Sequence, residues 1–174
     1  MPRLRAALSL AALFASLAAP FEAWAGGRQL HGGPSAGGAV LAGRDVAVGG
    51  TVGGHLGFGL TDAFRVYGAV DVPLGASIAD GAFSLWPGAS AGVAYSLDVG
   101  TWVPWLGLEA RAHVVYARAA LGFAVGGGAR VGVDWLPQRY FGLSIQASYA
   151  ALYFDGGLGH SVTLVAGPRW TVDL

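Results

Sequence analysis

The chain has 174 residues, with ten arginines balancing ten acids, and only 11% of its residues are charged, against about 25% in a typical soluble domain. Thirty glycines, a mean hydropathy of +0.54 and the absence of lysine leave too little charge to cover a water-facing surface. The neutral balance excludes electrostatic binding of nucleic acid, and the absence of cysteine excludes disulfides, a lipoprotein anchor and thiolate metal sites.

The first 25 residues have the layout of a secretory signal peptide. Two arginines precede an apolar stretch from 6 to 19, and Ala23-Trp24-Ala25 fits the small-x-small cleavage rule. The alternative is a retained anchor, but the apolar stretch is short of the about 20 residues that a membrane-spanning helix needs. We expect residues 1–25 to be removed on export and residues 26–174 to form the mature protein.

The rest of the chain alternates between apolar and small or polar residues. In the segment 46–60, Val48, Val52 and Leu56 share one face, and Thr51 and His55 share the other. A period of two predicts a β-strand with one apolar face. The same alternation recurs at 64–72, 83–97, 102–116, 119–135, 140–153 and 161–174.

Turn signals separate these segments. Short turns near residues 61, 99 and 138 alternate with longer connections expected at 74–82, 111–119 and 153–160, the layout of an outer-membrane barrel. An even strand number then requires one more strand before residue 46. Only 28–43 can supply it, although Gly32-Gly33-Pro34 interrupts its pattern. We therefore predict an all-β fold, an eight-stranded antiparallel transmembrane up-and-down β-barrel with both termini in the periplasm.

Alternation alone does not say which face is outside, since a soluble lipocalin-like barrel has the same period with the opposite polarity. The polar face carries too few charges for a water-facing exterior, and the aromatic residues of the apolar face cluster beside the turns. Amphipathic rings at one level form the girdle expected where lipid headgroups meet hydrocarbon. This girdle is predicted to comprise Phe58, Phe64, Tyr95, Trp102, Trp135, Phe141 and Trp170.

With the apolar face toward outer-membrane lipids, the polar face lines a narrow lumen. The predicted lumen cluster is His55, Arg65, Asp71, Glu109, Arg111, His113, Arg130, Asp134, Gln146 and Arg169. Glu109 and Arg130 fall on consecutive strands and are expected to meet near mid-membrane, with Gln146 at a similar height. Because buried charges must be paired, we interpret this pair as the centre of a polar plug. The alternative is a narrow channel for ions or small solutes.

This pattern resembles the small outer-membrane β-barrel families related to the OmpA membrane domain and OmpX. The turn context 58–65 is similar to their short periplasmic turns, and Trp170-Thr171-Val172-Asp173-Leu174 resembles their C-terminal insertion signal. That signal usually ends in phenylalanine, so Leu174 departs from it. The resemblance implies a Gram-negative outer-membrane protein that engages the barrel-assembly machinery through its last strand. It implies function only loosely.

An enzyme is the other class that the sequence raises, since some eight-stranded barrels act on lipid A. His160-Ser161 is superficially similar to a lipid A deacylase pair, but adjacent strand residues point to opposite faces. His113 aligns better with Glu109, yet no serine accompanies them. The four histidines lack metal-ligand spacing. We predict a non-enzymatic monomer without metal or cofactor, which contacts extracellular partners through the three longer loops.

Overall fold

The computed structural model describes residues 28–43, 45–97, 99–117, 120–138, 140–154 and 156–174. The expected signal peptide, residues 1–25, lies outside the described residues. Every regular element within these ranges is a β-strand. A search of the same ranges for a helix long and apolar enough to cross a membrane finds none.

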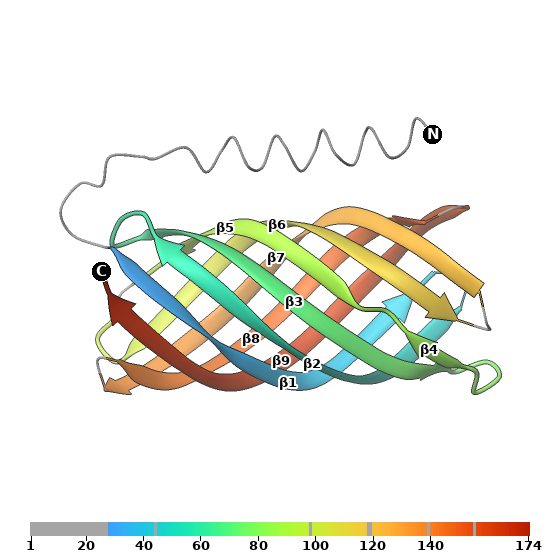
Figure 1. Ribbon diagram of the computed structural model, residues 1–174, viewed down its shortest axis with the longest axis horizontal. Helices are drawn as coiled ribbons and strands as arrows, with labels where there is room; N and C mark the ends of the chain where they lie inside the picture. The colour runs from blue at the N-terminus through green and yellow to red at the C-terminus, as the bar shows by residue number, and fades with distance from the viewer. Residues whose placement is uncertain (1–27, 44, 98, 118–119, 139, 155) are drawn as a thin grey trace.

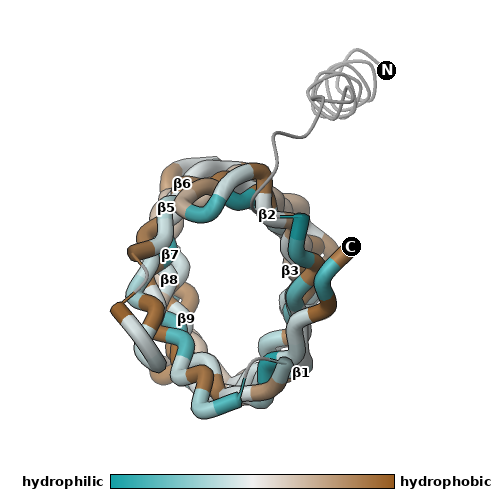
Figure 2. Tube along the Cα trace, turned by 90° about the vertical axis from the view of Figure 1, so that its left-hand side faces the viewer, coloured by the Kyte–Doolittle hydropathy of each residue, from teal (hydrophilic) through white to brown (hydrophobic). Residues whose placement is uncertain are grey.

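The strands form one antiparallel sheet that closes into a ring (Figures 1 and 2). They are β1 (Gln29–Ala42), β2 (Val46–Gly59), β3 (Phe64–Ser77), β4 (Phe83–Leu85), β5 (Gly88–Ser96), β6 (Trp102–Ala117), β7 (Ala120–Gln138), β8 (Phe141–Phe154) and β9 (Gly157–Asp173). Apart from β4 and β5, which do not pair with each other, consecutive strands are paired, and the ring closes where β1 pairs with β9.

Strands β4 and β5 are two parts of one barrel strand. Both lie between β3 and β6 and pair with each of them. The break falls at Trp86 and Pro87, because proline has no N–H to give to the ladder. Backbone bonds bridge the break, since Trp86 donates to Pro73 O and Val114 donates to Pro87 O. The barrel therefore has eight strands, and the predicted eight-stranded antiparallel fold is confirmed.

The strand predicted at 28–43 is β1, and its Gly-Gly-Pro sequence lies inside the strand. On the β2 side pairing is continuous through Pro34, but on the β9 side it stops at Gly32 and resumes at Ala36. The register places Pro34 opposite Pro168, and neither residue can donate a backbone hydrogen bond there. Backbone pairing is therefore interrupted at this point of the seam, the junction of β1 and β9 at which the barrel closes.

Gly33 is required at this seam, because a Cβ there would lie 1.9 Å from the carbonyl oxygen of Pro168. We expect Gly33→Ala to lower the free energy of unfolding by about 1–3 kcal/mol, the usual cost of overpacking. Urea unfolding of protein folded into lipid vesicles measures this change. Gly38→Ala is the control on the same strand, because its Cβ would lie 3.9 Å from the nearest atom. Equal unfolding midpoints for the two variants would contradict the seam argument.

The connections differ from the prediction at one end of the barrel. At the near end, where β1 begins and β9 ends, residues 60–63, 97–101 and 139–140 connect the strands, close to the predicted turns. At the far end the longer connections predicted at 74–82, 111–119 and 153–160 are wrong. β3 continues to Ser77, β6 to Ala117 and β8 to Phe154, so the strand bounds reduce these three connections to 78–82, 118–119 and 155–156. The alternation persists into these segments, and pairing across each hairpin satisfies their backbone groups.

The barrel is apolar outside and polar inside. On β2 the exposed fractions of Val48, Val52 and Leu56 are 46%, 56% and 51%, whereas Ala47 and Thr51 are buried. On the other long strands the large apolar side chains mostly point outward, and the buried charged side chains, which belong to β3, β6, β7 and β9, point inward. The polarity is the reverse of that of a barrel whose outer surface faces water.

Candidate functional site in the barrel lumen

The ten residues predicted to line the lumen lie on inward-facing positions of six strands, β2, β3, β6, β7, β8 and β9. Eight of them are buried: Arg65, Glu109, Arg111, His113, Arg130, Asp134, Gln146 and Arg169. His55 and Asp71 are half-buried and line a small mid-lumen cavity. The charged members form two ion-pair networks, one near the end where β1 begins and one at mid-barrel, and a hydrogen bond of 3.0 Å from Gln146 Nε2 to Ser144 Oγ links them.

The near-end network is centred on Asp134 of β7. Its carboxylate accepts hydrogen bonds from Arg65 Nη1 at 3.2 Å and from Ser144 Oγ at 2.6 Å, and it forms a salt bridge with Arg169. The Arg65 guanidinium also lies over the Trp105 ring, with Cζ 4.4 Å from the ring centroid. One buried carboxylate therefore joins side chains from β3, β8 and β9 across the lumen.

The mid-barrel network is centred on Glu109 of β6. Its carboxylate is 2.5 Å from Arg111 Nη2 and 2.9 Å from Arg130 Nε, and it accepts a hydrogen bond from the Tyr67 hydroxyl at 3.2 Å. The Glu109 side chain is fully buried. Two guanidiniums and a phenol thus surround one carboxylate, an arrangement that offsets part of the cost of burying its charge.

The pairing register explains how Glu109 and Arg130 meet. Glu109 lies opposite Gly128, and Arg130 lies opposite Gly107, so the two long side chains are diagonal neighbours on adjacent strands. Neither glycine places a side chain of its own between them, and the Tyr67 ring lies over Gly107. Gln146 joins the same layer, because Arg130 Nη1 donates to its Oε1 at 3.4 Å.

Polar side chains from the remaining strands complete this layer. Arg130 donates to Ser90 Oγ at 3.2 Å, and Arg111 donates to Ser148 Oγ at 3.0 Å. Ser148 in turn shares a hydrogen bond of 2.6 Å with Thr163. The layer therefore contains side chains from β3, β5, β6, β7, β8 and β9.

The histidines of the predicted cluster lie outside both salt-bridge networks. His113 Nδ1 is 3.0 Å from the Trp86 carbonyl oxygen, and His55 Nδ1 is 3.4 Å from Gln146 Nε2. Asp71 is not brought into an ion pair, and its carboxylate oxygens have no hydrogen-bond partner in the described part of the chain. The ten predicted residues therefore include four arginines and three acids.

Other lumen residues were not predicted, and three of them carry rings. His31 is buried beside His55, with ring centroids 6.3 Å apart, and Trp86 and Trp105 both point inward. Both tryptophans fall on the positions of the two-residue alternation that face the lumen, so the sequence pattern would have assigned them there. His31 was missed because β1 has the weakest alternation of the eight strands.

The residues of the predicted girdle lie on the outer surface at the near end. Six of them are exposed, and Phe58 is half-buried. Phe64 and Tyr95 pack edge to face at 5.1 Å, and Trp102 stacks on Trp135 at 6.0 Å. A second set of exposed rings at the far end was not predicted: Phe83, Tyr116, Phe123 and Tyr153.

The arrangements considered for an enzyme or a metal centre are not assembled. His160 points outward and stacks on Tyr149, whose hydroxyl is 2.7 Å from His160 Nδ1, whereas Ser161 is buried in the lumen. Glu109 is occupied by two arginines rather than by His113. Within the ranges that the structure describes, no three histidine or acidic side chains are grouped so that they could hold a metal ion.

Comparison with known proteins bears on the fold. No family model and no curated protein matches the sequence. The crystal structure of Neisserial surface protein A (NspA) matches with a TM-score of 0.67 and 18% identity, over 81% of this chain and 96% of that one. The outer membrane protein OprG from Pseudomonas aeruginosa matches with a TM-score of 0.55 and 11% identity, over 86% and 99%. The resemblance stated from the sequence is confirmed, and the chain has the fold of the small outer-membrane β-barrels.

Proposed function

We propose that this chain is an integral protein of a Gram-negative outer membrane, a structural barrel with a closed lumen that presents its far-end hairpins at the cell surface. The observation that carries the proposal is the inverted polarity of the barrel. Exposed side chains such as Leu108 and Val70 are large and apolar, and the ionised side chains of the strands are inside. Such an exterior is stable only in an apolar solvent.

The dimensions of the barrel also support hydrocarbon as the medium around its outer wall. Strand β2 has 14 residues, which at about 3.3 Å per residue and a tilt of about 40° span roughly 35 Å, more than the about 25 Å apolar band of an outer-membrane barrel. Aromatic side chains gather at both ends of this band. A closed barrel also leaves no unpaired strand edge in the hydrocarbon.

The two salt-bridge networks support a plug rather than an open channel. An eight-stranded barrel has an interior just wide enough for side chains, and here Arg65, Asp134 and Arg169 span it at one level. Glu109, Arg111 and Arg130 span it at the next level. Solutes would have to separate paired buried charges in order to pass.

The partners follow from the surfaces. Outer-membrane lipids surround the apolar wall, and β9, which closes the ring against β1, is the strand that the barrel-assembly machinery would engage. The far-end connections are short, so contact with an extracellular partner would involve the hairpin tips, with 78–82 as the longest of them. We propose a monomer, because closure within one chain satisfies both strand edges.

Cell fractionation with gel migration tests this proposal. We expect the full chain to be recovered from the outer-membrane fraction and its unboiled form to migrate differently from the boiled form, because a closed barrel resists unfolding by detergent. A chain that lacks residues 1–25 is the control and should remain in the cytoplasm. Recovery of a folded monomer in detergent-free buffer would refute the proposal.

A further inference from the structure

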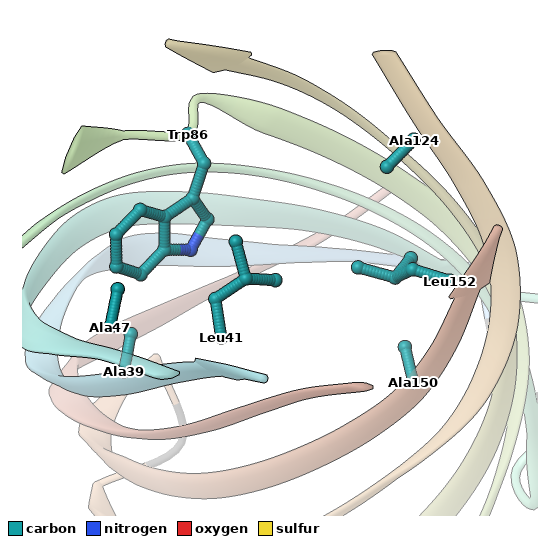
Figure 3. Packing of buried hydrophobic residues seen from close by; sticks show 7 residues of the cluster. All are labelled: Ala39, Leu41, Ala47, Trp86, Ala124, Ala150 and Leu152. Atoms are coloured by element: carbon teal, nitrogen blue, oxygen red, sulfur yellow. The ribbon is translucent and has the colours of Figure 1, made fainter. Parts of the chain in front are cut away.

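The far half of the lumen differs in chemistry from the two charged layers. Seven buried apolar side chains meet there, from four strands (β1, β2, β7 and β8) and the break between β4 and β5 (Figure 3). They are Ala39, Leu41, Ala47, Trp86, Ala124, Ala150 and Leu152. Val115 and Phe154 pack against this cluster from the rim. An apolar layer therefore covers the charged layers on the side of the far-end hairpins.

A cavity of about 360 Å³ lies beside this layer, at the far mouth of the barrel. Leu41 and Ala47 belong to both the cluster and the cavity wall, and Val115, Phe154 and Leu158 supply more apolar wall. The polar side chains of the lining are the exposed Asp45 and two serines, and the serine hydroxyls are already engaged. Ser84 Oγ donates to Gly75 O, and Ser77 Oγ accepts from Ala79 N, each at 3.3 Å.

We propose that this cavity is a binding site for a small, uncharged and largely apolar molecule. Its volume of about 360 Å³ falls within the range of small-molecule sites, roughly 300–1,000 Å³. An apolar cavity of about 150 Å³ in another protein accommodates benzene, so this one has room for a molecule the size of two fused rings. An ionised ligand would lose its hydration against the apolar layer, which is costly, and the only charge among the described lining residues is the carboxylate of the exposed Asp45.

The position of the cavity determines how the ligand arrives and why it stops there. Residues at the strand ends, Gly43, Ala117 and Gly157, frame the cavity, so it opens at the end of the barrel and not through the lipid-facing wall. The ligand therefore enters from the aqueous side that the proposed function identifies as extracellular. Below the apolar layer the charged networks close the lumen. The site binds its ligand and does not conduct it.

Photolabelling of the full protein in liposomes tests the site. The probe is 3-phenyl-3-(trifluoromethyl)diazirine, and peptide mass spectrometry locates the label. Val114 and Val115 are adjacent on β6, but Val114 faces outward and Val115 lines the cavity. We expect excess naphthalene to suppress labelling of Val115 and to leave labelling of Val114 unchanged, because only a site of defined volume saturates.

A cavity-filling variant provides the second measurement. Ala47→Phe places a ring in the cavity, and we expect it to lower the saturable labelling of Val115 by about tenfold or more, the loss that follows when about 1.4 kcal/mol of binding is removed. Ala42→Phe is the matched control, because Ala42 pairs with the exposed Val46 on the same hairpin but faces lipid. This control should keep the labelling.

The outcomes separate this proposal from the proposed function. Labelling of Val115 that does not saturate, or that Ala47→Phe leaves unchanged in a folded barrel, would overturn the binding site. If Ala47→Phe does not fold, competition by naphthalene in the unmodified protein decides alone. Absence of label at Val114 would instead contradict membrane insertion, since dissolved probe must reach any residue that faces hydrocarbon.

Discussion

Replacing Glu109 by alanine is expected to lower the free energy of unfolding of the barrel by about 3–5 kcal/mol, the cost of breaking a buried ion pair and leaving its partner charged. Two guanidiniums, those of Arg111 and Arg130, lose the carboxylate between them, and Tyr67 loses its hydrogen-bond acceptor. Urea unfolding in lipid vesicles measures the change. In planar bilayers the same variant should open more often than the unmodified protein, which should stay closed.

The matched control is Asp62→Ala. Asp62 is an exposed acid in the turn between β2 and β3, so its removal should change the free energy of unfolding by no more than about 0.5 kcal/mol. If Glu109→Ala altered neither unfolding nor conductance, the plug interpretation would be wrong. Steady conductance of the unmodified protein would instead favour the narrow channel.

A charge placed on the outer wall is the second substitution for which we expect a large effect on stability. Leu108 is 65% exposed near the middle of β6, where it pairs with Val93 and Ala129. If hydrocarbon surrounds this position, Leu108→Arg should cost about 2–4 kcal/mol of folding free energy in vesicles. In water the same substitution at an exposed site would cost about 0.5 kcal/mol or less. Equilibrium unfolding in vesicles distinguishes the two solvents.

The control is the same substitution at a different depth along the outer wall. Leu97 is also exposed, at 52%, but lies just beyond β5 at the near-end rim. Leu97→Arg should cost only about 0–1 kcal/mol, because a long cationic side chain at the interface reaches water. Equal costs at Leu97 and Leu108 would mean that the wall contacts a uniform solvent, and the membrane proposal would fail.

The short far-end hairpins narrow the choice of surface functions. Long loops would provide variable contact surfaces, whereas β8 and β9 are still paired at Phe154 and Gly157, which leaves a short hairpin. The mouth of the lumen offers a concave surface instead. Recognition at the cell surface would then involve small molecules at Leu41, Val115 and their neighbours rather than an extended protein interface.

Much of this architecture follows from the sequence alone. Alternation is a local property of the pleated strand, so it assigns faces without knowledge of the fold, and it placed Arg65, Glu109 and Arg130 on the inner face. Consecutive strands of an up-and-down barrel are neighbours, so the meeting of Glu109 with Arg130 was also predictable. The extent of the strands was harder to predict, because glycine and alanine near Ala117 and Gly157 suit strands and loops equally.

Contacts across the lumen were decided by the tertiary structure. Asp134 joins Arg65 and Arg169, which are far apart in sequence and lie on strands that are not neighbours of each other. Such contacts depend on the tilt of the strands and on the stagger with which the ring closes, and no local pattern encodes either quantity. The far-end cavity depends on them as well, because its walls come from both ends of the chain and meet only when β1 pairs with β9.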